Sequence, residues 1–254
     1  MTLTHVPRAD QARGEFDGGA ILERKPIGFP REGGRLRAVS TLFYWAHAWS
    51  PAGGLIDLHA HQGFEIMTFV LGGRIRHFDT AGDAWRTIEE GGAQIIRAGS
   101  GISHAERLEP GASIFQIWVD PDVRRTLTQP PSYSDYPPRA FDLILEAGYA
   151  VKAYTGPGGP MELETPGVVV REYWLEPGPR RLPLAPDQVM VGFLRDGRVA
   201  IGETPVAPEE VVAVGDADGI EVRASEPSRF FTVACPAKAP YRTFAGAGAG
   251  GPGL

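Results

Sequence analysis

Cysteine is almost absent from this chain of 254 residues, because Cys235 is the only one. A single cysteine excludes an intramolecular disulfide and any cluster of thiolate metal ligands. Cys235 closes an apolar run that begins at Phe230, so we expect a buried, inert thiol rather than a nucleophile. The lack of disulfides is typical of a reducing compartment, and we predict a cytoplasmic protein.

Long apolar runs and positive charge are also scarce. Residues 1–19 contain no apolar core of signal-peptide length, and no segment approaches the roughly 18 apolar residues of a membrane span, so no membrane association is expected. Asp and Glu exceed Lys and Arg by 31 to 25. The resulting net charge of −6 argues against direct nucleic-acid binding, which normally needs a basic face. The small basic cluster of Arg31, Arg35 and Arg37 is better interpreted as a solvated strand edge or loop.

Helical periodicity is weak, whereas glycine and proline are abundant, with 33 and 23 residues. This composition indicates many short strands joined by turns. Alternating strands fill two blocks, residues 38–120 and 141–239, and prolines punctuate the connector between them. The sequence therefore predicts an all-β protein made of two β-barrels or sandwiches. We expect domains over residues 1–130 and 131–243, followed by a flexible Gly/Ala tail over 244–254.

Four residues of metal-ligand type form two pairs with the same spacing, His59 with His61 and His104 with Glu106. Residues i and i+2 of a strand point to the same face, so each pair projects into one barrel interior. Neighbouring strands would then place three imidazoles and a carboxylate around one point. Such ligands suit Fe(II), Mn, Ni, Cu or Zn, and they leave open positions of the kind that a catalytic site requires. The pattern predicts that the first block binds one divalent transition-metal ion. The second block has no histidine and therefore no such ligands.

Other polar residues near these pairs have less defined roles. Glu65 lies at an even offset from His59 and His61, so we expect it to face the same interior. It could be a distant ligand, a partner that fixes an imidazole tautomer, or simply a satisfied polar residue. His77 is interpreted as a surface or barrel-wall residue, and His47, among aromatics, could line the pocket mouth. His5 is expected to be a mobile terminal residue.

Glycine spacing adds a family resemblance. Residues 53–72 read G-x5-H-x-H-x3-E-x6-G, which resembles the first motif of the cupin superfamily. The stretches HAHQGFE at residues 59–65 and AGSGISHAE at 98–106 are similar to the pirin family, whose members are bicupins with a metal-free second half. Two positions depart from the family pattern. Residues 43–49 replace an upstream Asp-His-Phe stretch, and Ala98 stands where cupins have proline, which removes no ligand but alters the pocket wall.

The resemblance to pirins implies two cupin-type, jelly-roll-like barrels and a mononuclear centre held by His59, His61, His104 and Glu106. In pirins Glu65 stays outside the metal's own ligands. Some pirins resemble quercetin 2,3-dioxygenases, which implies an oxidoreductase that cleaves a flavonol or related planar enol with O2. A metal that lowers the pKa of the substrate hydroxyl, with a carboxylate as proton acceptor, would suit this reaction. We expect Fe(II) as the metal, Glu106 as the base and Glu65 as the second choice.

Two other functions remain open at this stage. Pirins include transcriptional cofactors, so the chain could be a metal- or redox-responsive regulator that acts through a protein partner without turnover. The third possibility is a cupin isomerase or hydrolase with a redox-inert metal, which no sequence feature supports. Because a fold does not determine a function, the site must decide between them.

Overall fold

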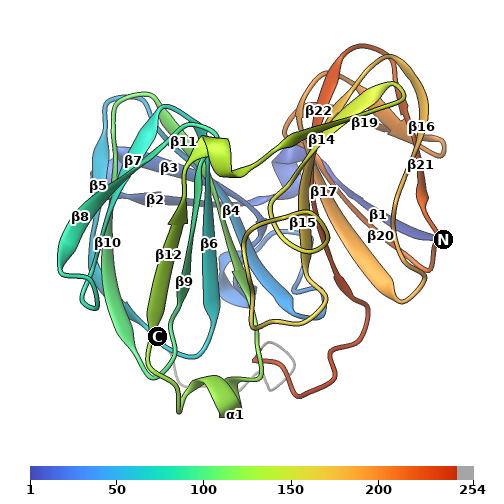
Figure 1. Cartoon of the computed structure of the whole chain (residues 1–254). Coiled ribbons are helices and arrows are strands. Elements are labelled where there is room, and N and C mark those ends of the chain that lie inside the picture. Colours follow the sequence, from blue (N-terminus) through green and yellow to red (C-terminus); the bar gives the residue numbers. More distant parts are fainter. Residues whose placement is uncertain (245–254) are drawn as a thin grey trace. The chain divides into compact units, whose positions relative to one another are not determined.

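The computed structural model describes residues 1–244 and divides into two compact units (Figure 1). Within the described residues, the N-terminal unit comprises Gln11–Ala140 and residues 240–244, and the C-terminal unit comprises Met1–Asp10 and Phe141–Ala239. Each unit pairs one seven-stranded and one four-stranded antiparallel sheet in a jelly-roll arrangement rather than a closed barrel. The predicted all-β fold with two cupin-type units is confirmed.

The N-terminal unit follows the strand pattern predicted from alternation. Its larger sheet has the order β12-β9-β6-β11-β4-β3-β2, and its smaller sheet has the order β5-β10-β7-β8. The strands are β2 (Ala12–Phe16), β3 (Ile21–Ile27), β4 (Leu42–Ser50), β5 (Gly54–His61), β6 (Glu65–Gly72), β7 (Arg74–Asp79), β8 (Ala84–Glu89), β9 (Ala93–Arg97), β10 (Ile102–Leu108), β11 (Ala112–Val119) and β12 (Ser132–Tyr136). Short helical segments are α1 (Val123–Thr126) and 3-10 turns at Asp17–Gly19, Pro30–Glu32 and Pro138–Ala140.

The C-terminal unit repeats this architecture. Its larger sheet has the order β1-β20-β17-β22-β15-β14-β13, and its smaller sheet has the order β16-β21-β18-β19. The strands are β1 (Thr2–Val6), β13 (Leu143–Glu146), β14 (Tyr149–Ala153), β15 (Val169–Leu175), β16 (Gly178–Leu182), β17 (Gln188–Asp196), β18 (Val199–Ile201), β19 (Thr204–Val206), β20 (Val211–Gly215), β21 (Ile220–Ala224) and β22 (Ser228–Pro236), with a 3-10 turn at Arg8–Asp10. Cys235 on β22 is fully buried, as expected.

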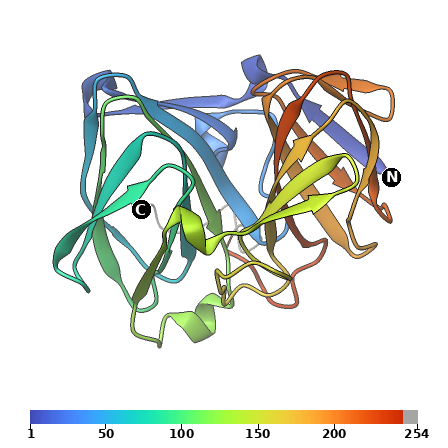
Figure 2. The same cartoon turned by 45° about the horizontal axis from the view of Figure 1, so that its top comes forward.

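The division of the chain differs from the expected boundaries in two places. Strand β12 lies within the proline-punctuated connector, and it pairs with β9, so the N-terminal unit extends to Ala140. Proline is tolerated there because β12 is an edge strand. Strand β1 pairs with β20, which places the first residues in the C-terminal unit; the blue strand beside the orange ones shows this in both views (Figures 1 and 2). His5 on β1 bonds Glu210 at 2.8 Å, so it is not a free terminal residue.

The core of the N-terminal unit lies between its two sheets. One cluster of buried side chains gathers around Tyr44, Phe64 and Trp118, and a second gathers around Ile75 and Ile114. The polar side chains described below lie between the same two sheets. Among residues 1–244, no helix combines the length and the apolar character needed to cross a membrane. The expected tail over 244–254 lies outside the described residues apart from Phe244.

Candidate metal centre

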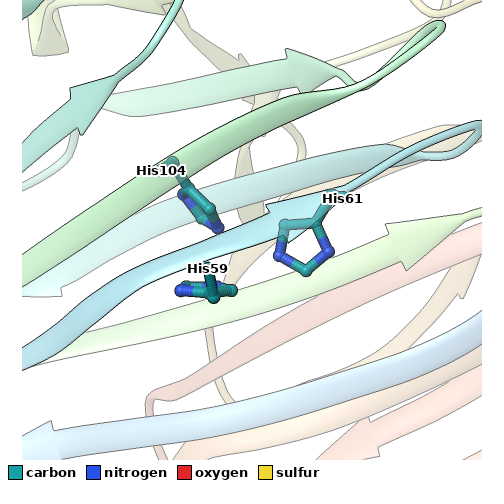
Figure 3. Close-up of side chains that lie close together, drawn as sticks. All are labelled: His59, His61 and His104. Carbon is teal, nitrogen blue, oxygen red and sulfur yellow. The ribbon is translucent and has the colours of Figure 1, made fainter. Parts of the chain in front are cut away.

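Three histidines converge inside the N-terminal unit, as Figure 3 shows. His59 and His61 lie two residues apart on β5, and His104 on β10 is the direct cross-strand partner of His59. The ring centroids are 4.8 Å apart for His59 and His61, 4.3 Å for His59 and His104, and 4.9 Å for His61 and His104. One nitrogen from each ring lies within 4.8 Å of the other two. Period-two alternation on adjacent antiparallel strands produces this triangle.

Four of the six imidazole nitrogens of this triangle are buried without hydrogen-bond partners. Both ring nitrogens of His61 and both of His104 are buried without a partner. His59 is the exception, because its Nδ1 lies 2.7 Å from the carbonyl oxygen of Asp57. A carbonyl only accepts, so Nδ1 of His59 donates the proton and Nε2 keeps a lone pair in the neutral ring.

Burial also keeps these rings neutral. Burial first, and the neighbouring His59 second, lower the pKa of His61 from 6.5 to about 3. The pKa of His104 is held well below its usual range, first by burial and then by the three nearby histidines. Both rings therefore offer lone pairs at neutral pH. Unpaired buried polar atoms are costly, and a cation between the rings would satisfy one nitrogen of each ring. The three histidines thus form a candidate site for a single metal ion.

Glu106 is close to His104 but does not belong to the histidine triangle. The register of β10 against β5 shifts between His104 and Glu106, so that Glu106 faces Ile56. A second group of possible ligand atoms, all within 4.8 Å of one another, consists of His77, His104 and Glu106. His104 is common to both groups. The structure brings the three predicted histidines together and places the predicted carboxylate next to one of them.

Three donors hold the carboxylate of Glu106. Gln116 Nε2 donates to Oε2 at 2.6 Å, whereas Gln94 Nε2 and Thr68 Oγ1 donate to Oε1 at 3.2 and 3.4 Å. Burial nevertheless raises the pKa of Glu106 to about 7, because the donors offset only part of the desolvation. A carboxyl group with this pKa can both take up and release a proton near neutral pH.

His77 is more central than the sequence suggested. It is fully buried on β7, opposite Glu106 on β10, and its ring stacks on Tyr133 at 4.4 Å. Its Nε2 lies 3.0 Å from Oδ2 of Asp79, while Gln94 approaches Nδ1 at 3.5 Å. The contact with Asp79 and the stacking on Tyr133 hold the ring in position, and burial lowers the pKa of His77 although Asp79 opposes this effect.

The orientation expected for Glu65 is wrong. On β6, Ile66 and Thr68 pair with Trp118 and Gln116, whose side chains face the site, so Glu65 points to the opposite face of the sheet. There it lies 3.7 Å from Arg97. The parity count from His61 fails because Gly63, with φ of +88°, turns the chain between β5 and β6. An even offset carries orientation only within one uninterrupted strand.

The surroundings of the triangle are aromatic on one side and open on the other. The Trp118 ring lies 4.9 Å from His61 and stacks on Phe64 at 5.6 Å. A cavity of about 430 Å³ borders His61, and its other walls are Ala60, Gln62, Thr80, Gly101, Ile102 and Ser103. His47 is not among these lining residues; it bonds Ser113 at 3.0 Å.

Sequence reasoning missed the uncharged side chains that hold Glu106. Thr68, Gln94 and Gln116 lie on three adjacent strands, at positions that the register brings side by side. Each lies among apolar neighbours in its strand, which was the available signal. The buried pair of Glu23 and Lys25, 3.2 Å apart on β3, was also missed because the first 37 residues look turn-rich.

The fold and the histidine triangle define a bicupin whose first unit carries the candidate metal centre. The family described as Pirin matches residues 46–119. A Mycobacterium bovis protein named "Putative quercetin 2,3-dioxygenase" is 34% identical over 185 residues, which cover 70% of this chain and 72% of that protein. The chain belongs to the pirin family.

Solved structures agree on the fold. The bacterial pirin YhhW from Escherichia coli, in complex with nickel(II), matches with a TM-score of 0.77 at 18% identity, covering 92% of this chain and 99% of that one. A quercetin 2,3-dioxygenase from Acinetobacter baumannii matches with a TM-score of 0.76 at 18% identity, covering 92% and 78%. Both matches extend over the two units, so the bicupin architecture is shared along almost the whole chain.

Proposed function

We propose that the chain is a metal-dependent dioxygenase that cleaves a flavonol or a related planar enol with O2. The observation that carries the proposal is the set of four buried, unpartnered ring nitrogens on His61 and His104 beside a His59 ring with a fixed tautomer. In this proposal His59, His61 and His104 bind one divalent transition-metal ion, with Glu106 as fourth ligand. Fe(II) is the first choice, and Mn, Ni, Cu or Zn have suitable ligand chemistry as well.

The bound metal would supply Lewis-acid and redox chemistry to an enol oxygen. The residues of the chain would provide the remaining parts. Glu106, with a pKa near 7, would accept the proton of the substrate hydroxyl. Gln116 and Gln94 would hold its carboxylate in place. Glu65 points to the other face of its sheet and does not take part.

The cavity beside His61 supports a small-molecule substrate. Its volume of about 430 Å³ lies within the usual range for ligand pockets. Trp118 and Phe64, which stack on one another beside His61, would exclude water from the histidines. The names of the Mycobacterium bovis relative and the Acinetobacter baumannii structure support quercetin as the first substrate to try.

The proposal is tested in two stages that can fail separately. The first is metal analysis of the protein reconstituted with Fe(II), Mn(II), Ni(II) or Cu(II). We expect one ion per chain, loss of the ion in His104→Ala, and retention in His47→Ala, which removes a histidine outside the triangle. Less than half an ion per chain with every metal would contradict the metal centre.

The second stage adds quercetin to the loaded protein without oxygen and then admits oxygen. We expect the flavonol absorbance to shift on binding and to bleach with oxygen consumption, and both effects to disappear in His104→Ala. Stoichiometric metal without bleaching for any of the four metals would refute the dioxygenase while leaving the metal site intact. That result would favour the alternative of a metal-responsive regulator.

A further inference from the structure

The C-terminal unit contains a cavity of about 620 Å³ that is unrelated to the histidine triangle. Strands β14, β15, β17 and β22 form its floor, and the segments around residues 181–185 and 218–219 form its rim. The floor is mostly apolar and aromatic, with Tyr149, Val169, Tyr173, Met190 and Ala234. This volume and character match the sites that bind small organic molecules.

An arginine lies in the middle of this floor. On β15, Val169, Arg171 and Tyr173 alternate with residues of the opposite face, and all three line the cavity. Arg171 is the cross-strand partner of Thr232, which also lines it. A core-facing strand position normally holds an apolar residue, so a guanidinium there calls for a partner.

The described residues 1–244 provide no anionic partner for Arg171, which forms no ion pair with any Asp or Glu of this range. Its side chain bonds the hydroxyl of Tyr173, a buried phenol that burial keeps protonated by raising its pKa. The guanidinium has five N–H donors, and one phenol oxygen satisfies few of them. The Tyr173 hydroxyl, accepting from Arg171, still has its own proton to donate.

The other arginine at this cavity behaves differently. Arg181 is exposed at the rim and lies 3.6 Å from Asp218 and 3.7 Å from Glu221. Its charge is therefore already balanced. The cavity thus offers one interior positive charge, one hydroxyl donor and an acidic residue at its mouth, a combination that suits a monoanion better than a phosphate dianion. A guanidinium fork matches a carboxylate in geometry and in charge.

We propose that the C-terminal unit binds a small aromatic monocarboxylate, with the carboxylate on Arg171 and Tyr173 and the ring against Tyr149 and Met190. This site is independent of the proposed metal centre. It gives the C-terminal unit, which lacks the predicted metal ligands, a ligand-binding role of its own that neither its strand pattern nor the pirin motif indicates.

The test uses trans-cinnamate as ligand and trans-cinnamamide as its neutral isostere, with metal-stripped full-length protein, so that binding of a carboxylate to a metal cannot contribute. Titration calorimetry should show one saturable site for cinnamate and at least tenfold weaker binding of the amide. Arg171→Met should weaken cinnamate binding tenfold or more, whereas Arg171→Lys should have an intermediate effect. The matched control Arg198→Met removes an exposed arginine of the same unit, outside the cavity, and should bind like the unaltered chain.

The location of binding is read separately, from the four methionines of the chain labelled with carbon-13 at the methyl group. Met190 lines the cavity and Met67 lies on β6 of the other unit. Cinnamate should shift the Met190 signal and leave that of Met67 unchanged. This measurement uses the unaltered sequence, so it does not depend on whether a variant folds. Equal affinity for acid and amide, no effect of Arg171→Met, or an unmoved Met190 signal would each overturn the proposal.

Discussion

Glu106 provides the sharpest quantitative prediction, because it is a fully buried carboxyl group with a pKa of about 7. In the unfolded chain the same group titrates at its ordinary value of 4.5. Between these values the folded state binds the proton and the unfolded state releases it, so stability falls as pH rises. This destabilisation of the folded state is absent below pH 4.5 and complete above pH 7. At about 1.4 kcal/mol per pH unit, it costs the metal-free protein about 3 kcal/mol.

The variant Glu106→Gln removes this titration while keeping the shape of the side chain. We expect the free energy of unfolding of the variant, relative to the unaltered chain, to rise by about 2–3 kcal/mol between pH 5 and pH 8. Altered hydrogen bonds to Gln116 and Gln94 add a constant offset, which cancels in the difference between the two pH values. Urea unfolding of both proteins at pH 5 and pH 8, with a chelator present, measures the change in the free energy of unfolding. Tryptophan fluorescence is the suitable probe, because four of the five tryptophans lie in the N-terminal unit.

One result would refute this reasoning about Glu106. If the two proteins showed parallel stability curves from pH 5 to pH 8, the carboxyl group would titrate normally, and the three donors would outweigh its desolvation. The metal-loaded protein serves as the internal comparison. A cation beside the carboxylate favours the ionised form, so loading with metal should flatten the pH dependence of the unaltered chain.

Two further predictions concern the same unit. Burial lowers the pKa of His61 from 6.5 to about 3, so the neutral ring costs no stability above pH 6.5, and the folded state loses stability as the pH falls from 6.5 toward 3. In metal-free protein, His61→Phe should therefore reduce the loss of unfolding free energy between pH 7 and pH 4 by about 3 kcal/mol. Urea unfolding at the two pH values measures this difference. Equal losses in both proteins would contradict this. A methyl group on Gly63 would lie 2.6 Å from Val123 Cγ1, at a φ of +88°. Gly63→Ala should therefore lower the free energy of unfolding by about 2 kcal/mol or more. Gly18 also has a positive φ but open space around it, so Gly18→Ala should lower it by only about 1 kcal/mol. Thermal melts compare the two variants, and equal melting temperatures would exclude the steric explanation.

Local alternation was sufficient to predict the histidine triangle. His59 and His61 share one face because β5 is uninterrupted between them. His104 lies on β10 before the register shift of that strand. The cross-strand pairing of His104 with His59 then needed only that the two strands be neighbours. The antiparallel pairing of β7 with β8 lies within the first predicted block of alternating strands.

The features that sequence reasoning missed depend on breaks in that alternation or on distant pairing. The register shift after His104 changes the partner of Glu106, and the turn at Gly63 reverses the face of Glu65. Neither break has a residue signature strong enough to be located without the paired strand. His77 looked peripheral because its partners, Tyr133 and Gln94, come from strands far along the chain. Whether Glu106 is a metal ligand stays a prediction.

The pairing of β1 with β20 has a consequence for how the protein can be made. Strand β1 is synthesised before residues 11–140, whereas its partner β20 at Val211–Gly215 is synthesised after them. Until then the segment has an open hydrogen-bonding edge and no sheet to join. Strand β1 can therefore join its sheet only after residues 11–140 have been made, and dividing the gene at the proline-rich stretch would leave the C-terminal unit without this strand.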